Sequence, residues 1–511
     1  MAQPAAKSRS TDGDRVAGPR ARSRAAVAVL AALVALVLAV PAGALAATDV
    51  QVSPSSATPD PAAPHGAQQP RVAADPTNAQ RFVASYQKSA KDGSIDSCYV
   101  ATSTNAGQSW SQQSLVGPQN PAATFRFNLP TGFGECLDPQ VSVGPNGTIY
   151  YLYEPRQLAG LGERRVMLTT SSDFGATWST PHEVNAVGFE RTDLWSSMAV
   201  DPRSGRVYVA WLRYCEPPTN LSGLPTNDPT ACAPNPLRVL VAYSDDAGKT
   251  FSAPVSVDAV SRDPSRTSLT VDRVNGRVSV AWSEGAGSTT AVAPPNADLL
   301  VASSTDGAKS FSPARPVALV DGNSTECDRL RWTQHSSSHG FFHLLAGKSA
   351  DQLYVARWDI DPTAPGQRCR VFFQRSADGG ATWTQPKVVG DAGRPATNQQ
   401  HRPRLALSPD GNKLYMLYYD TDTAAHRQDV YEVTSPDGGD TWTSPVKVSD
   451  TSSDTTIGPD DRPTATHERS FGEWLGVDAS SAGLVGAWTD SRLGNPSTNL
   501  EQDVFSDTLG L

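Results

Sequence analysis

Charged side chains recur at equivalent places in this sequence of 511 residues, and their types suit the binding and cleavage of an acidic sugar. Two carboxyl groups can act as acid and base in glycoside hydrolysis. Arginine holds a carboxylate through two parallel hydrogen bonds. The candidate catalytic carboxylates are Asp138, Glu284, Asp420 and Asp490. The candidate substrate-binding residues are Arg71, Trp195, Arg213, Arg402, Arg404, Glu473 and Arg492.

Each candidate flanks a strand of a repeated unit. Glu284, Asp420 and Asp490 each stand two residues beyond the last position of a unit. Arg71 and Asp138 stand at or just before the first strand of theirs. The strands of the repeat must therefore carry these side chains to a common place.

The repeated unit is an apolar strand, a turn rich in Asp, Pro or Gly, and a second strand that ends at an aromatic position. It occurs seven times, although only the second strand is recognisable in the fifth copy, residues 351–357. The closing positions are Tyr86, Tyr153, Trp211, Trp282, Arg357, Tyr418 and Trp488. Short strands at regular spacing are typical of all-β repeat folds.

A second pattern, close to Ser-x-Asp-x-Gly-x-Thr-Trp, follows six of the seven units. Its copies occupy residues 103–110, 171–178, 244–251, 304–311, 376–383 and 435–442. Asp and Ser side chains can bond the backbone of a tight turn, and Gly supplies its left-handed conformation. The pattern predicts a turn between two further strands, with the final Trp or Phe packed into the core.

The two patterns predict four antiparallel strands in each unit, which is one blade of a β-propeller. The last unit shows only three such strands. Residues 48–52 resemble the outer strands of other units and can supply the missing one, which removes an open sheet edge. We predict a single all-β propeller of seven blades, or of six if the first or last unit is not a full blade.

The six turns resemble the Asp-box repeats of the sialidase superfamily, and the resemblance extends from Arg71 to the end of the sequence. It implies a propeller but no particular reaction, because Asp boxes are structural and also occur in lyases, other glycosidases and receptors. Sialidases carry an arginine triad, a Tyr–Glu nucleophile pair and an aspartate acid/base. Here Gln69-Pro70-Arg71-Val72 departs from their Arg-Ile/Leu-Pro motif. No Tyr–Glu pair can be assigned, although Tyr153-Glu154 is available.

Loop lengths predict which face of the propeller carries function. The turns between first and second strands, and between third and fourth strands, are short. The long connections follow the second strands or join blades, as at residues 117–137, 214–237, 285–297 and 321–338. Long loops on a rigid scaffold commonly carry functional residues. We therefore expect the site on the face opposite the Asp-box turns.

Residues 1–46 have the features of a secretory signal peptide. They contain six basic and two acidic residues, and an apolar run at 25–40 leads to Ala44-Leu45-Ala46. An uncleaved anchor is the alternative, because residues 25–47 can span a bilayer. We predict an extended leader at 47–68, part of which is the closing strand, and a propeller domain at 69–511. The expected location is secreted or extracytoplasmic, with no membrane span after cleavage.

Six cysteines fit an oxidising compartment, and no C-x-x-C motif indicates a zinc ribbon or a redox site. The repeats place Cys98 and Cys136 in neighbouring units on the loop-bearing face. Cys215 and Cys232 bracket one long loop, and Cys327 and Cys369 flank the start of the fifth unit. The predicted disulfides are Cys98–Cys136, Cys215–Cys232 and Cys327–Cys369.

The net charge of −9 argues against nucleic acid as a partner, because phosphate binding needs clustered Lys and Arg. His335, His339 and His343 are spaced four apart, but a metal site would require them to converge. We expect no metal centre and no cofactor, with a structural calcium ion near Asp420-Thr421-Asp422 as the alternative. The expected partner is an anionic carbohydrate, and the protein is expected to be a monomer.

Three functional hypotheses follow from these observations. The first is a secreted sialidase-like glycoside hydrolase that acts on an acidic glycan through a central funnel of arginines and carboxylates. The second is a non-catalytic extracellular propeller that binds a glycan or a protein. The third is a polysaccharide lyase, which needs a Tyr or His base and an arginine that neutralises the substrate.

Overall fold

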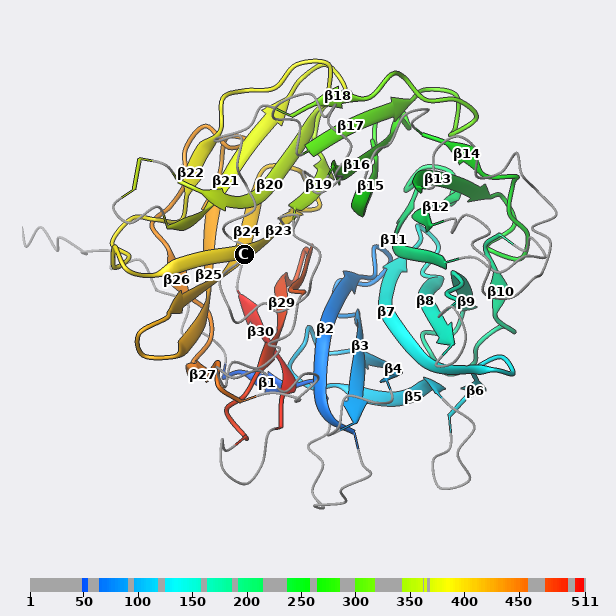
Figure 1. The fold of residues 1–511 in the computed structure, drawn as a ribbon, viewed down its shortest axis with the longest axis horizontal. Coiled ribbons are helices and arrows are strands. Elements are labelled where there is room, and N and C mark those ends of the chain that lie inside the picture. The colour runs from blue at the N-terminus through cyan, green and yellow to red at the C-terminus, as the bar shows by residue number, and fades with distance from the viewer. Residues whose placement is uncertain are drawn as a thin grey trace, which may run out of the picture. The chain divides into compact units, whose positions relative to one another are not determined.

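The computed structural model describes residues 48–53, 64–90, 96–117, 125–157, 163–185, 192–214, 237–257, 264–284, 299–317, 342–361, 363–364, 368–457, 474–494 and 501–509. Their regular elements are β-strands in seven sheets arranged as a ring (Figure 1). Within these ranges, no helix has the length and apolar character that a bilayer span requires. The seven-bladed all-β propeller is confirmed, and the six-bladed alternative is wrong.

The first four blades follow the chain, and each begins with its innermost strand. Blade 1 contains β2 (Pro64–Ala74), β3 (Phe82–Ala90), β4 (Asp96–Ser103), β5 (Ser111–Gly117) and β6 (Phe127–Asn128). Blade 2 contains β7 (Phe133–Val143), β8 (Ile149–Gln157), β9 (Met167–Ser171) and β10 (His182–Glu183). Blade 3 contains β11 (Thr192–Val200), β12 (Val207–Tyr214), β13 (Leu237–Ser244) and β14 (Val255–Ser256). Blade 4 contains β15 (Pro264–Val271), β16 (Val278–Glu284), β17 (Leu299–Ser304) and β18 (Arg315–Pro316).

The last three blades complete the ring. Blade 5 contains β19 (Phe342–Ala346), β20 (Leu353–Ile360), β21 (Cys369–Ser376) and β22 (Lys387–Val389). Blade 6 contains β23 (Gln399–Leu407), β24 (Leu414–Asp422), β25 (Arg427–Ser435), β26 (Val446–Lys447) and β27 (Ser453–Asp454). Blade 7 contains β28 (Gly476–Ser480), β29 (Gly483–Asp490), β30 (Asp503–Leu509) and β1 (Val50–Gln51). Because β2 starts at Pro64, the propeller begins inside the segment predicted as a leader.

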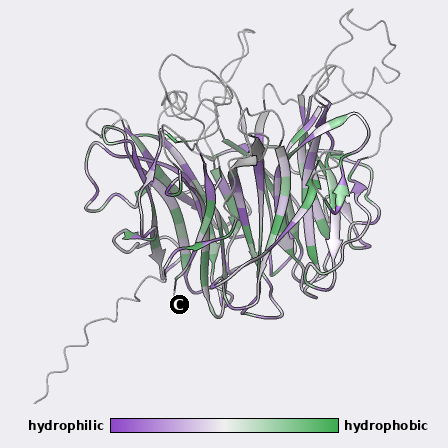
Figure 2. Cartoon of the chain, turned by 90° about the horizontal axis from the view of Figure 1, so that it is seen from below, coloured by the Kyte–Doolittle hydropathy of each residue, from purple (hydrophilic) through white to green (hydrophobic). Residues whose placement is uncertain are grey.

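The core consists of one apolar cluster between each pair of neighbouring blades. The second strand of each blade supplies side chains to the clusters on both of its faces, as Leu212 and Trp211 of β12 do. This two-sided burial explains the nearly continuous apolar runs of these strands. Figure 2 shows hydrophobic residues along the strands around the ring. The aromatic residues of the closing column are buried, and Arg357 of blade 5 is buried as well.

The Asp-box turns lie at the ends of the third strands, as predicted. In the sixth copy, Ser435 Oγ donates to Asp437 Oδ1 (2.8 Å) and accepts the Gly439 N–H (2.7 Å). Gly439 has a left-handed backbone (φ 97°), and a Cβ there would lie 2.1 Å from the Phe373 ring of blade 5. The Trp442 ring packs edge-on against the same Phe373 ring, with centroids 5.1 Å apart. The turn therefore anchors one blade on the preceding one.

The N-terminal strand β1 closes the ring as the outer strand of blade 7. Val50 pairs with Ser506 and Gln51 with Phe505, and the Val52 N–H donates to the Val504 carbonyl (2.7 Å). Val52 is fully buried in the apolar cluster between blades 7 and 1. The predicted pairing of residues 50–52 with 504–506 is confirmed.

A cluster of three carboxylates around Arg492 holds the same strand. We call Asp49, Asp450, Asp490 and Arg492 the closure cluster. Arg492 lies 2.5 Å from Asp49 Oδ2, 2.5 Å from Asp450 Oδ1 and 2.7 Å from Asp490 Oδ2. The Asp450 N–H also donates to Asp49 Oδ2 (2.8 Å). Asp49 therefore ties the N-terminal segment to blades 6 and 7.

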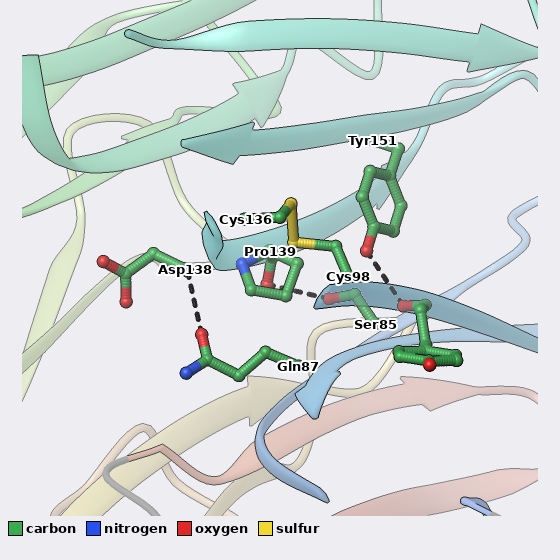
Figure 3. Close-up of a disulfide and its surroundings, with 8 residues drawn as sticks. Ser85, Gln87, Cys98, Cys136, Asp138, Pro139 and Tyr151 are labelled. Atoms are coloured by element: carbon green, nitrogen blue, oxygen red, sulfur yellow. Dashed lines mark hydrogen bonds between the residues drawn. A yellow bond between two sulfur atoms is a disulfide. The ribbon is translucent and has the colours of Figure 1, made fainter. Parts of the chain in front are cut away.

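One predicted disulfide is present between blades 1 and 2. Cys98 of β4 is bonded to Cys136 of β7, with their Cα atoms 5.6 Å apart (Figure 3). Cys369 is also disulfide-bonded. Its predicted partner Cys327, like Cys215 and Cys232, lies outside the described residues, so the other two pairings stay predictions. Residues 1–46 lie outside them too.

Removal of residues 47–53 is expected to destabilise the propeller, because it unpairs β30 and exposes the cluster that Val52 fills. We expect the free energy of unfolding to fall by roughly 3–5 kcal/mol. Urea denaturation of the truncated and full chains measures the difference, with the exposed Thr48→Ala as the control. Equal midpoints for the truncated and full chains would show that β1 does not close the ring.

The closure cluster predicts a pH dependence of stability. Burial, together with a hydrogen bond to Asp450, raises the pKa of Asp49 to about 8. An unfolded Asp loses its proton near pH 4, so the folded chain binds the extra proton between about pH 4 and 8 and loses stability as pH rises through that window. Asp49→Asn cannot ionise, so its stability relative to wild type should increase from pH 5 to pH 9. A difference that is constant across thermal unfolding curves at these pH values contradicts the prediction.

Candidate functional site

Five of the inner strands are interrupted by a bulge at or before the middle of the strand. In each of these strands the register with the second strand shifts, and a residue other than glycine takes a left-handed backbone. These residues are Gln69 (φ 59°), Asp138 (φ 47°), Trp195 (φ 51°), Arg266 (φ 49°) and Arg402 (φ 52°). Such a bulge bends a strand and re-aims a side chain. The five bulges surround one end of the central channel.

These bulges are energetically unfavourable when considered alone. A left-handed backbone at a residue other than glycine costs about 1–3 kcal/mol and persists where the surroundings enforce it. Proline follows the bulge residue in three strands, as Pro70, Pro139 and Pro403. Each inner strand leaves this end toward the face of the Asp-box turns, so the bulges lie on the opposite face. Strained backbone that recurs in five blades makes this end of the channel the candidate site.

A pocket of about 280 Å³, including its open mouth, lies among the bulges. Its walls come from β2, β7, β11 and β15 and from the segment before β28. The lining residues are Gln69, Arg71, Asp138, Pro139, Gln140, Trp195, Ser196, Arg266, Thr267 and Trp474. We call this the inner-strand pocket. It brings together three sequence-predicted residues, Arg71, Asp138 and Trp195.

Two arginines stack on one tryptophan in the inner-strand pocket. The guanidinium carbon of Arg71 lies 3.8 Å from the ring centre of Trp474, and that of Arg266 lies 5.2 Å from it. Arg266 also lies 5.7 Å from the Trp195 ring. Arg71 and Arg266 are buried. Aromatic faces attract and orient guanidinium groups, so the pocket holds two positioned cations beside aromatic walls.

The walls of the pocket are tied to one another by hydrogen bonds between blades. The Gln140 side-chain amide donates to the Ser196 carbonyl. Thr267 Oγ1 donates to the Trp195 carbonyl (2.7 Å). Between β28 and β2 the backbones nearly touch, because a Cβ at Gly476 would lie about 3.0 Å from Arg71 backbone atoms. Side chains on such cross-braced strands are positioned more rigidly than side chains on loops.

Asp138 is fixed at the boundary of blades 1 and 2. Its N–H donates to Gln87 Oε1 (3.2 Å), and Cys136, two residues before it, is bonded to Cys98. Figure 3 shows the Asp138 carboxyl group pointing away from the disulfide. The carboxyl group keeps 14% of its surface exposed, so it remains accessible from the pocket.

A second carboxyl group lies beneath Asp138. Glu154 of β8 is fully buried, and its Oε1 accepts hydrogen bonds from the Ser196 N–H and Oγ (both 2.8 Å). One Arg164 nitrogen lies 4.0 Å from Asp138 Oδ2 and 3.7 Å from Glu154 Oε2. Burial and the Asp138 charge raise the pKa of Glu154 well above its ordinary range, although Arg164 and Ser196 oppose the shift.

Four other predicted site residues form ion pairs outside the inner-strand pocket. Asp420 accepts hydrogen bonds from Arg394 (2.7 and 3.1 Å) and from the Asn398 amide (2.5 Å). Arg213 forms two bonds of 2.8 Å to Asp193. Asp490 and Arg492 belong to the closure cluster. All these groups are buried or nearly so, and each supports the packing of blades 3, 6 or 7.

The remaining predicted residues do not line the pocket or lie outside the described residues. Arg402 is the buried bulge residue of β23. Arg404, on the same strand, is half-buried as a whole residue. Burial of its guanidinium group lowers the pKa of that group to about 10. Neither lines the pocket. Glu473 and the side chain of Glu284 are not described.

The residues that were considered as metal ligands have other contacts where they are described. His343 lies on β19, and its Nδ1 accepts the Leu405 N–H (3.0 Å). Asp422 accepts the N–H groups of Ala424 and Ala425 (3.1 Å each). Across the described ranges no three His, Cys, Asp or Glu side chains are grouped to hold a metal ion.

Sequence analysis gave no role to four residues of the site, Gln69, Gln140, Arg164 and Trp474. It named Glu154 only as part of an available Tyr153-Glu154 pair and assigned it no function. The bulges offered a partial signal, because proline stands directly after Gln69, Asp138 and Arg402. Glu154 directly follows the aromatic position of its unit, one residue before the column that was considered. Nothing in the repeat singles out Arg164 or Trp474.

No protein-family profile matches the sequence, and no curated protein does. Among solved structures, a protein of unknown function from Dyadobacter fermentans is similar, with 14% identity and a TM-score of 0.45 over 74% of this chain and 94% of that one. The Hadza microbial sialidase Hz136 has 13% identity and a TM-score of 0.43 over 84% and 76%. The NanB sialidase of Streptococcus pneumoniae has 8% identity and a TM-score of 0.43 over 87% and 94%. With likenesses this distant, the basis for a function is the pocket itself.

The ion pairs predict that the candidate carboxylates differ in their effect on stability. Asp420→Asn and Asp490→Asn each weaken a buried pair, and we expect losses of about 2–4 kcal/mol. Asp138→Asn should change stability by less than about 1 kcal/mol, because Asn tolerates a left-handed backbone and the pocket is open to water. Urea denaturation of the three variants measures this order, and equal losses for all three would contradict it.

Proposed function

We propose that the protein binds an acidic sugar residue in the inner-strand pocket and hydrolyses the glycosidic bond beside it. The observation that carries the proposal is the pair of buried arginines, Arg71 and Arg266, both stacked on Trp474 within reach of one pocket. Buried guanidinium groups that face a small pocket favour an anionic ligand.

The other lining residues fit the same ligand. The Trp195 ring supplies an apolar wall for a face of the sugar ring. Gln69 and Gln140 offer amide groups to hydroxyl groups. In the hydrolysis, water adds its hydroxyl group to the sugar and its proton to the leaving oxygen, and Asp138 takes part in that proton transfer. Glu284, the last residue of β16, remains the predicted second carboxyl group.

The disulfide between Cys98 and Cys136 supports an extracellular location for this activity, because disulfides persist in oxidising compartments. The signal-like segment at residues 1–46 supports the same location. The resemblance of the Asp boxes to those of sialidases makes sialic acids the first substrates to test, followed by glycosides of uronic acids.

A non-catalytic glycan-binding propeller is the second candidate. One observation favours it: of the four predicted catalytic carboxylates, Asp420 and Asp490 are held in ion pairs, and only Asp138 lines the pocket. A lyase has less support, because the described lining contains neither Tyr nor His to act as its base.

Chromogenic glycosides of sialic acid, glucuronic acid and neutral hexoses test the proposal with the secreted protein. We expect release from an acidic glycoside only. Asp138→Asn should lower kcat by about 100-fold or more, and Arg266→Gln should raise KM roughly 10- to 100-fold for the acidic substrate. Arg206→Gln, which alters an ion pair with Asp245 at the Asp-box end, is the matched control.

Calorimetric titration of the free sugar acids separates the outcomes. Binding that depends on Arg71 and Arg266, without any hydrolysis, supports the second candidate and overturns the first. A protein that neither binds nor cleaves an acidic sugar overturns both.

A further inference from the structure

The carboxyl groups of Asp138 and Glu154 both lie near the guanidinium group of Arg164. Arg164 places one guanidinium nitrogen within 4.0 Å of an oxygen of Asp138 and within 3.7 Å of an oxygen of Glu154. Arg164 is held by its backbone, because its carbonyl accepts the Asp193 N–H (3.1 Å). If both carboxyl groups were ionised, two negative charges would lie close together around Arg164 in a largely buried place. Like charges this close favour one retained proton.

The two carboxyl groups differ in their access to water. Glu154 has no exposed side-chain surface, whereas Asp138 keeps 14% exposure in the pocket. Glu154 Oε1 accepts two hydrogen bonds from Ser196, but Glu154 Oε2 is buried without one. A charged oxygen that is buried without a hydrogen bond costs more free energy than a neutral one. The proton is therefore more stable on Glu154.

We propose that Arg164 and Glu154 set the protonation state of Asp138, so that Glu154 keeps the one proton of the pair at neutral pH and Asp138 remains a carboxylate. Glu154 is then a positioning residue, which acts on the pocket through Asp138. The inference deepens the proposed function, because a carboxylate at Asp138 suits a base that accepts a proton from water. It also names the regulation of the site, which is the titration of a group outside the pocket.

The other charged groups around the pair have contacts of their own. On β7 and β8, Glu135 pairs with Arg156. On β11 and β12, Asp193 pairs with Arg213 at 2.8 Å. Across the pocket, Arg71 and Arg266 stack on Trp474 and keep their positive charges. The proton of the Asp138–Glu154 pair therefore responds to Arg164, to the two pocket arginines and to an anion that they bind.

This arrangement has a consequence for ligand binding. When pH rises far enough for Glu154 to lose its proton, a second negative charge appears beside Asp138. An anionic sugar in the pocket is then repelled. Its affinity should fall by about tenfold across that titration, which corresponds to roughly 1.4 kcal/mol of added charge repulsion.

Infrared spectroscopy tests the proposal directly, without any substrate. Wild-type protein at pH 7 should show the C=O stretch of a protonated carboxylic acid that Glu154→Gln lacks. In Asp138→Asn, the same band should disappear at a lower pH than in wild type, because the neighbouring negative charge is gone. Glu163→Gln is the matched control: Glu163 is a buried glutamate paired with Arg165 in the same blade.

The outcomes distinguish this inference from the proposed function. A wild-type spectrum at pH 7 without the Glu154 band overturns the inference, and so does a band that titrates identically in Asp138→Asn. If Glu154→Gln does not fold, the comparison of wild type with Asp138→Asn still decides, because that comparison needs no change in the buried residue. A protein with the expected band that cleaves no glycoside refutes hydrolysis and leaves the coupling intact.

Discussion

The pairing of β1 with β30 is the interaction on which the rest of the structure depends. Each apolar cluster is shared by two blades, so every blade needs a neighbour on both faces. The cluster between blades 7 and 1 includes Val52, which reaches it from the N-terminal segment. Consecutive inner strands contact one another around the whole ring, including β28 with β2. A ring closed in this way holds the inner strands at fixed positions around one channel.

Closure allows strain to be concentrated at one end of that channel. A left-handed bulge in an isolated strand would relax, but here neighbouring blades hold it through bonds such as Thr267 to Trp195. Four of the five bulge residues line the pocket. The side chains that we propose to bind the ligand are therefore carried mostly by strands rather than by the long loops that the sequence analysis favoured. The seven-fold repeat determines the propeller fold, and the different side chains at the bulges determine which groups the pocket offers to a ligand.

The sequence predicted the propeller fold well, because the patterns that indicate it are local and recur in each blade. An Asp-box serine and aspartate bond their own turn, as Ser435 and Asp437 do, and a column of buried aromatics marks each second strand. The closing strand and the Cys98–Cys136 bridge followed from the same repeats. The repeats could not show which charged residues line the pocket, because the ion-pair partner of each charged residue depends on how the blades pack around the ring. Asp420 is held by Arg394, which lies in the connection before its own blade.

The site residues that the sequence analysis did not select also depend on contacts between blades. Trp474 reaches the pocket from blade 7, while the arginines stacked on it come from blades 1 and 4. Glu154 points inward from β8 and meets Ser196 of the next blade. Such contacts join residues far apart in the sequence, and no spacing rule marks them. The only sign of the bulges in the sequence was a proline directly after three of the five bulge residues.

A crystal structure of the protein with a bound sugar acid tests the central claim most directly. We predict the acid group of the ligand at the guanidinium groups of Arg71 and Arg266, its ring against Trp195, and Asp138 beside the anomeric carbon. A ligand bound elsewhere on the propeller, or with a neutral face turned toward these arginines, would contradict the assignment of the inner-strand pocket as the functional site.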